Sequence, residues 1–576
     1  MIRFQSLPRQ IISYGGNRWD WALLPIVLAF LALLAWGASQ MSAPYQVGTS
    51  LPILLDPIML PYYLFRTMLR MCFAMIISLL FACVFAILAT KIKLAERVLL
   101  PLLDILQSIP VLGFSFITLA GFIALFPGNL LGVECAAIFA IFTSQAWNMA
   151  FSLYQSLRTI PFDLAEAACV FRLSGWQRFW RLELPFAMPN LLWNMMMSMS
   201  GGWFFVVASE AISVSNQSIR LPGIGSYIAL AIDMHNIHAI LWAIVAMGLG
   251  ILIYDQCIFR PLLAWADKFR FEETGGGNAQ TSWLLSWLRR TNHFQKLGFI
   301  IGKSIVTTFS WFYRRELRPM PSMDVRTISP RWMHLFDFFM LMVVLLISWQ
   351  LVHFILRTVH WVEISHVFAL GCYTMIRVLV LIMIATLFWV PIGVWIGLNP
   401  NWSNRLQALA QFMAAFPANL MFPLMVIMIV RFQLNPNIWL SPLMILGTQW
   451  YLLFNVIAGA SAIPTELRYA AKNTGLKGWL KWKRYLLPAI FPSFITGAIT
   501  ASGGSWNASI VAEYARWGDT TLKAEGLGSY IAHMTAVGDY PRLALGIGMM
   551  CLFVMSLNGF VWRKLYRISV ERIRLS

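Results

Sequence analysis

The sequence reads Gly223-Ile224-Gly225-Ser226-Tyr227-Ile228-Ala229 in its first half and Gly526-Leu527-Gly528-Ser529-Tyr530-Ile531-Ala532 in its second. The blocks around these two stretches, residues 161–229 and 464–532, align with each other without a gap. A motif that recurs inside so long a gapless block is typical of an internal duplication, as in transporters built from repeats. We therefore interpret the chain as two homologous halves.

The correspondence extends upstream of these blocks. Thr67-Met68-Leu69-Arg70 corresponds to Thr374-Met375-Ile376-Arg377, and Pro110 recurs at the same spacing as Pro417. Matching positions within the aligned blocks are occupied by the pairs Trp203 and Trp506, and Glu210 and Glu513.

Composition places both halves in a membrane. Of the 576 residues, 59% are hydrophobic and 12% are charged, whereas a soluble protein needs far more polar surface. Apolar runs of about 20 residues, enough to cross a bilayer as a helix, recur along the chain. They lack the two-residue alternation of a membrane barrel, so we predict an all-α polytopic membrane protein. We expect twelve spans, near residues 20–40, 60–90, 99–126, 131–157, 186–213, 236–262, 333–356, 366–397, 406–430, 437–462, 489–513 and 542–562.

The net charge of +19 orients the helices in this interpretation and does not indicate nucleic-acid binding. Basic residues gather at both termini, in a few short loops and in a central linker, which is the positive-inside pattern. We predict that both termini and the linker are cytoplasmic and that the loops near 41–57 and 214–235 are periplasmic. Six helices per half give both halves the same orientation, related by a pseudo-two-fold axis along the membrane normal.

The expected domains are a first repeat over residues 1–263, a linker over 264–330 and a second repeat over 331–576. The linker opens with the glycine-rich stretch 271–278, which is typical of a flexible break. Its remainder mixes apolar and basic residues, which favours amphipathic helices on the cytoplasmic membrane surface. A poorly ordered connector is the alternative.

The loop after the fourth expected span carries a similar short motif in each half. The first copy, residues 163–185, contains Glu166-Ala167-Ala168 and ends in Leu-Pro; the second, residues 466–488, contains Tyr469-Ala470-Ala471 and also ends in Leu-Pro. Alanines let a short helix approach a partner closely, and a glycine permits a sharp turn. Proline is tolerated in the first turn of the following helix. Such a loop is suited to sit in a groove of another protein and transmit its movement.

These loops resemble the EAA loop of binding-protein-dependent ABC permeases, in which Glu-Ala-Ala is followed at fixed spacing by Gly and then Leu-Pro. The spacing fits in both halves. Arg172 takes the glycine position of the first copy and Tyr469 the glutamate position of the second, so the two docking surfaces are unequal. The residues expected to couple to an ATPase are Asp163, Glu166, Ala167, Ala168, Arg172, Gly175, Tyr469, Ala470, Ala471, Gly475 and Gly478.

The whole chain apart from the linker is similar to the nitrate, sulfonate, taurine and bicarbonate permease group in its duplicated form. This resemblance implies two fused six-helix type I importer repeats in a bacterial inner membrane, surrounded by lipid. It also implies two cytoplasmic ATPase subunits on the two loops and a periplasmic solute-binding protein that delivers a small anion. ATP would be hydrolysed by the partner, so the chain would hold no cofactor and would not itself be an enzyme. A secondary transporter, or an importer of a non-anionic solute, is the alternative.

Charged residues inside membrane spans are costly and point to function or to pairing. Arg70 and Arg377 lie within the second span of each half, and Glu210 and Glu513 lie late in the fifth. The arginines either lend positive potential to an anion pathway or pair with the glutamates and hold helices together; the second reading is slightly favoured. The residues expected along the pathway are Arg70, Trp203, Glu210, Arg377, Trp506, Asn507 and Glu513.

Other chemistries find little support in the sequence. The seven cysteines form no close pair, and His235 and His238 have no evident third ligand, so we expect no metal site. Residues 298–304 are similar to a P-loop, but the spacing of their glycines does not match that motif. The sequence contains no recognisable catalytic cluster of a membrane-embedded enzyme.

Overall fold

The computed structural model describes residues 18–45, 51–109, 111–214, 217–269, 282–289, 330–461, 463–517 and 520–572. The chain forms two compact units. The first comprises the described parts of residues 1–43, 155–194 and 252–327, and the second those of 44–154, 195–251 and 328–576. The expectation of amphipathic linker helices falls mostly outside the described residues; within the linker region the structure shows the short helix α12, Trp283–Arg289.

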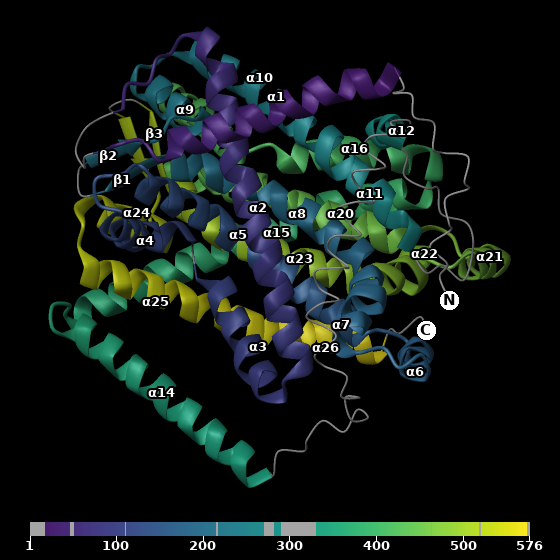
Figure 1. Ribbon diagram of the computed structural model, residues 1–576. Helices are drawn as coiled ribbons and strands as arrows, with labels where there is room; N and C mark the ends of the chain where they lie inside the picture. The colour runs from purple at the N-terminus through teal and green to yellow at the C-terminus, as the bar shows by residue number, and fades with distance from the viewer. Residues whose placement is uncertain are drawn as a thin grey trace. The chain divides into compact units, whose positions relative to one another are not determined.

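Helices dominate both halves (Figure 1). The long helices of the first half are α1 (Arg18–Met41), α2 (Leu60–Lys91), α3 (Lys93–Ser108), α4 (Val111–Leu125), α5 (Leu131–Arg158), α8 (Leu184–Glu210) and α10 (Ile237–Tyr254). Their counterparts are α14 (Pro330–Leu356), α15 (Trp361–Leu398), α16 (Pro400–Ala415), α17 (Phe422–Arg431), α20 (Gln449–Ser461), α23 (Leu487–Ala512) and α25 (Tyr540–Leu557). The same order of elements in both halves is what a duplication predicts.

Eight described helices are long and apolar enough to cross a membrane, or nine if the bent pair α18–α19 (Pro436–Trp439, Ser441–Leu446) and α20 counts as one span. This count differs from the twelve continuous spans expected. The difference lies partly in the third expected span of each half, which is divided between α3 and α4 and between α16 and α17.

Each of these breaks comes at a residue that precedes a proline. Ile109 has φ −76° and ψ 126°, and Phe416 has φ −71° and ψ 124°, so both are extended. The ring of a following proline disfavours the helical conformation of the residue before it. Pro110 and Pro417 therefore account for a break at the same place in each half.

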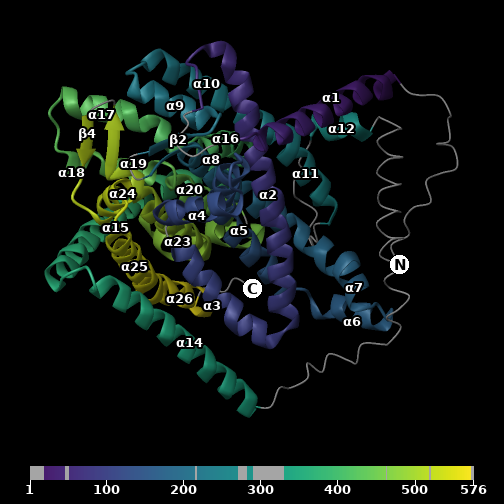
Figure 2. The same ribbon diagram turned by 60° about the vertical axis from the view of Figure 1, so that its left-hand side comes forward.

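A short β-hairpin directly follows α8 in the first half and α23 in the second. Strands β1 (Ala211–Val214) and β2 (Gln217–Arg220) pair antiparallel after α8, with Ala211 opposite Arg220. Strands β3 (Tyr514–Trp517) and β4 (Thr520–Lys523) do the same after α23, beside α17 and α18 (Figure 2). Each hairpin leads to a short helix that carries the repeated glycine motif, α9 (Ile224–Asp233) or α24 (Leu527–Val537).

An extensive apolar core in the second unit lies among α15, α20, α23, α24 and α25, around buried side chains such as Val378, Leu452 and Trp506. Helix α14 runs alongside α25 (Figures 1 and 2) and buries only 6% of its most apolar stretch. A helix that is apolar all round and so little covered is suited to lie against lipid.

Candidate functional site

Arg70 lies at the centre of a buried ionic network in the first half. Its Nε donates to Oε2 of Glu134 over 2.6 Å, and its Nη1 donates to Oε1 of Glu210, also over 2.6 Å. Its Nη2 donates to Oε1 of Glu134 and to the carbonyl of Pro222. Arg66, one turn earlier on α2, donates to Glu134 as well over 2.6 Å. These four charged side chains are 0 or 1% exposed, so two cations and two anions neutralise one another inside the protein.

The repeated glycine motif forms a cradle for Glu210, which ends α8. The amide of Gly225 donates to Oε2 of this carboxylate over 2.7 Å, and Thr67 donates to Oε1. A Cβ placed on Gly223 would lie 2.3 Å from the carboxylate carbon, closer than any real contact, so this position has no room for a side chain. The motif is therefore explained by the glutamate that it surrounds, and the two features belong to one site.

The second half repeats this arrangement with fewer charges. Arg377 donates to Oε1 of Glu513 over 2.9 Å, Thr374 donates to the same oxygen, and the amide of Gly528 donates to Oε2. A Cβ on Gly526 would again lie 2.3 Å from the carboxylate. The other acceptor of Arg377 is the amide oxygen of Asn437, 3.3 Å from Nη2.

The first network contains one arginine and one glutamate more than the second. Asn437 occupies the position that Glu134 has in the first half, and Tyr373 occupies that of Arg66. One half thus carries two arginines and two glutamates, and the other carries one of each, so each network is neutral. The repeated charges in the sequence predicted a role for Arg70, Arg377, Glu210 and Glu513. They gave no sign of Arg66 and Glu134, because the counterparts Tyr373 and Asn437 are uncharged.

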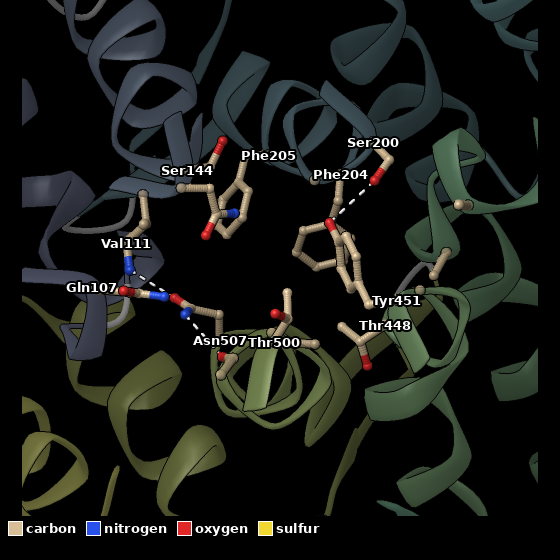
Figure 3. Close-up of a pocket in the computed structure, with 18 of the residues that line it drawn as sticks. Gln107, Val111, Ser144, Ser200, Phe204, Phe205, Thr448, Tyr451, Thr500 and Asn507 are labelled. Carbon is tan, nitrogen blue, oxygen red and sulfur yellow. Dashed lines mark hydrogen bonds between the residues drawn. The ribbon is translucent and has the colours of Figure 1, made fainter. Parts of the chain in front are cut away.

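A cavity of about 130 Å³ lies elsewhere in the second unit, lined by residues from both halves (Figure 3). Gln107, Asn507 and Val111 lie together on one side, Ser200 and Tyr451 on the other, and Phe204 and Phe205 between them. Among the described lining residues none is Asp, Glu, Lys, Arg or His.

Of the residues expected along the pathway, only Asn507 lines this cavity. Its side-chain oxygen accepts the amide of Val111 over 2.9 Å, and its nitrogen donates to the carbonyl of Gly503. Trp203 and Trp506 are each 1% exposed, and Trp506 packs within the apolar core of the second half. Arg70, Glu210, Arg377 and Glu513 belong to the two ionic networks.

The first loop predicted to couple to an ATPase lies in the first unit. It is built from α6 (Phe162–Val170), a turn and α7 (Gly175–Arg178). Ala168 is buried, Ala167 is half-buried, and Asp163 and Glu166 are exposed. Arg172 takes φ 49° in the turn, a left-handed conformation that costs a non-glycine residue about 1–2 kcal/mol.

The second loop predicted to couple to an ATPase lies in the second unit and has the same elements: α21 (Thr465–Asn473), a turn and α22 (Gly478–Lys481). Ala471 is buried, while Tyr469 and Ala470 are exposed. Gly475, which aligns with Arg172, has φ 67°. The left-handed turn is therefore kept in both loops, and glycine adopts it without strain only in the second.

Both loops present apolar side chains that the chain itself does not cover. Phe162 and Val170 are 72% and 79% exposed in the first, and Tyr469 and Trp479 are 68% and 73% exposed in the second. Exposed apolar patches rimmed by polar residues are typical of protein interaction sites.

A comparison against protein families matches both halves of the chain. The family described as the binding-protein-dependent transport system inner membrane component matches residues 78–257 and again residues 389–575. The chain belongs to this family. It is therefore a multi-pass membrane permease with two fused repeats, and its family works with an ATPase and a binding protein.

Several curated relatives are similar to parts of the chain. The nitrate import permease protein NrtB of Synechocystis is 24% identical over 246 residues, 41% of this chain and 84% of the relative. The bicarbonate transport system permease protein CmpB of Synechococcus elongatus is 25% identical over 134 residues, which cover 23% of this chain and 45% of the relative. The glycine betaine/proline betaine permease ProW of Escherichia coli is 27% identical over 233 residues, 38% of this chain and 61% of the relative.

Proposed function

We propose that this chain is the permease subunit of an ABC importer and forms the path for a small anion. The observation that carries the proposal is the pair of coupling loops, which keep the same helix–turn–helix and left-handed turn in both halves of a family member. The nitrate and bicarbonate relatives support an anion as the solute. Because the family matches residues in both halves, 78–257 and 389–575, a secondary transporter is not favoured.

In this proposal a periplasmic binding protein delivers the anion, and two cytoplasmic ATPase subunits engage α6 and α21. Asn507 and its neighbours contact the solute, whereas Arg70, Arg377, Glu210 and Glu513 hold the helices around the cavity in place. Neutralised arginines lend no positive field to the pathway, so this division of roles follows from the ion pairs.

We also propose that the protein lies in an inner membrane with both termini and the linker in the cytoplasm. The basic residues of the linker and of the C-terminal tail support this orientation. Single cysteines placed in the linker should react with a membrane-impermeant maleimide only after the membrane is opened. Labelling of intact cells at these positions would overturn the orientation.

The solute class is tested by uptake. The chain, reconstituted in proteoliposomes with its ATPase and binding-protein partners, should accumulate a labelled small anion only when ATP is supplied on the ATPase side. Nitrate, bicarbonate, ethanesulfonate and glycine betaine form a suitable panel. Accumulation of glycine betaine alone would contradict the anion assignment, and accumulation without ATP would contradict the importer mechanism.

A further inference from the structure

Two corresponding pairs of segments carry very different charge in the two halves. In the first half, residues 174–184 and 255–267 contain three basic and three acidic residues. Their counterparts at the same spacing in the second half, residues 477–487 and 558–570, contain seven basic residues and no acidic one. The basic residues are Lys477, Lys481, Lys483 and Arg484 in one segment, and Arg563, Lys564 and Arg567 in the other. One copy is thus neutral and the other strongly positive.

In the first half, basic residues of these segments have acidic partners close in sequence. Nε of Arg178 lies 2.9 Å from Oε1 of Glu183, and Nε of Arg260 lies 2.9 Å from Oδ2 of Asp255. In the second half the two acidic positions are taken by uncharged residues, Leu486 and Asn558. The equivalent ion pairs therefore cannot form there.

The two positive segments lie at the same end of the second half. Helix α23 ends beside the N-terminal half of α15, where Glu513 pairs with Arg377. Helix α25 begins beside the same part of α15, where Arg542 pairs with Glu363. The two helices therefore run in opposite directions, and the start of α23 lies at the same end as the end of α25. Helix α26 (Arg563–Arg572), which continues from α25, packs against α23 (Figure 1).

Both segments also lie at the ends of helices that are long enough to cross a membrane. The continuous helical stretches that contain α23 and α25 are Gly478–Ala512 and Tyr540–Leu565. Six of the seven basic side chains are exposed. Trp479 and Phe560, one in each segment, are 73% and 72% exposed, and the ammonium of Lys564 lies 5.8 Å from the centre of the Phe560 ring. Exposed aromatic rings and cations at the ends of membrane helices are typical of the headgroup level of a bilayer.

We propose that residues 477–487 and 558–570, the basic end of the second half, bind the headgroups of anionic phospholipids. The headgroup phosphates supply the negative charge that acidic side chains supply in the first half, and they accept hydrogen bonds from lysine and arginine. Helix orientation by the positive-inside pattern does not account for the difference, because it does not require the second half to lack the acidic residues of the first. The inference goes beyond the proposed function, since it concerns the lipid and not the solute.

The proposal is tested by titrating the purified full-length protein with lipid in a neutral detergent and counting bound lipids by native mass spectrometry. Phosphatidylglycerol, whose headgroup carries one negative charge, should bind at least about tenfold more tightly than zwitterionic phosphatidylcholine with the same acyl chains. Equal binding of the two lipids overturns the proposal. The measurement uses the permease without an ATPase or a binding protein, so this outcome would leave the importer function standing.

A variant that replaces four exposed cations of the basic end locates the binding. Its substitutions are Lys483→Gln, Arg484→Gln, Lys564→Gln and Arg567→Gln. It should lose the preference for phosphatidylglycerol, because each cation near an anionic headgroup contributes to the attraction. Its melting temperature should stay close to that of the wild type, since all four side chains are exposed.

The matched control removes four exposed cations elsewhere, and its substitutions are Lys93→Gln, Arg181→Gln, Arg357→Gln and Arg431→Gln. This control lowers the net charge of the protein by the same amount and should keep the preference for phosphatidylglycerol. An unchanged preference in the variant of the basic end, or an equal loss in both variants, overturns the proposal.

Discussion

Replacing Arg70 with glutamine should prevent recovery of folded protein, whereas the same change at Arg377 should be milder. Arg70 is fully buried between Glu134 and Glu210, and removal of one partner from a buried ionic group costs about 3–5 kcal/mol. That is a large share of the free energy of unfolding of a typical protein, about 5–15 kcal/mol. Arg377 is 14% exposed and faces a single carboxylate, which Thr374 and Gly528 also satisfy.

The measurement is the yield of monodisperse protein and its melting temperature in detergent. Arg431→Gln, at an exposed arginine on α17, serves as the matched control and should behave as wild type. Adding Glu513→Gln to Arg377→Gln should restore stability, because the unpaired charge disappears with its partner. If the double variant remains as unstable as Arg377→Gln alone, the pair does not act by mutual neutralisation.

The residues around Arg377 in the second half suggest a double substitution in the network of the first half. Arg66→Tyr leaves the first network with one excess negative charge, and Glu134→Asn leaves one excess positive charge. Together they reproduce the composition found around Arg377 and keep the network neutral. The double variant should therefore cost clearly less than the sum of the two single variants, as residues in one network are strongly coupled. Strict additivity would show that charge balance does not explain the difference between the halves.

The duplication decided which parts of the two ionic networks could be predicted from the sequence. Matching Arg70 with Arg377 and Glu210 with Glu513 led directly to the expectation that they pair, and the structure shows the ion pairs. Glu134 was overlooked because its counterpart is Asn437, so a search for repeated charges passes over it. Periodicity alone could not show that residues from 211 onward leave the helix for a hairpin, since the apolar run continues through Ala211 and Ile212.

Of the cavity, the residues expected along the pathway included only Asn507. The cavity's polar lining comes from positions such as Gln107 and Asn507 that stand far apart along the chain, and only packing of the two halves brings them together. The structure of the two loops could be predicted from local sequence. A sharp turn at Gly475 and small residues on a short helix are local requirements, whereas the coupling role of the loops stays a prediction.

Ala470→Arg should abolish solute-stimulated ATP hydrolysis while leaving the protein folded. Ala470 is exposed on the same face of α21 as Glu466, Tyr469 and Asn473, so a long side chain there has room among the residues that the structure describes. In the proposed complex that face lies against the ATPase, where an arginine would hold the surfaces apart. Ala470→Ser, which adds a single oxygen, is the matched control and should retain stimulation.

The corresponding change in the first loop should affect folding as well as coupling, because the two loops are not equivalent. Ala167 is half-buried, so Ala167→Arg should lower the melting temperature as well as the stimulation. Arg172→Gly relieves the left-handed strain at the same loop and should preserve coupling if the turn itself is what the partner needs. ATP hydrolysis is measured in the reconstituted complex with and without loaded binding protein. Full stimulation in both Ala470→Arg and Ala167→Arg would show that α6 and α21 are not the surfaces through which the ATPases drive transport.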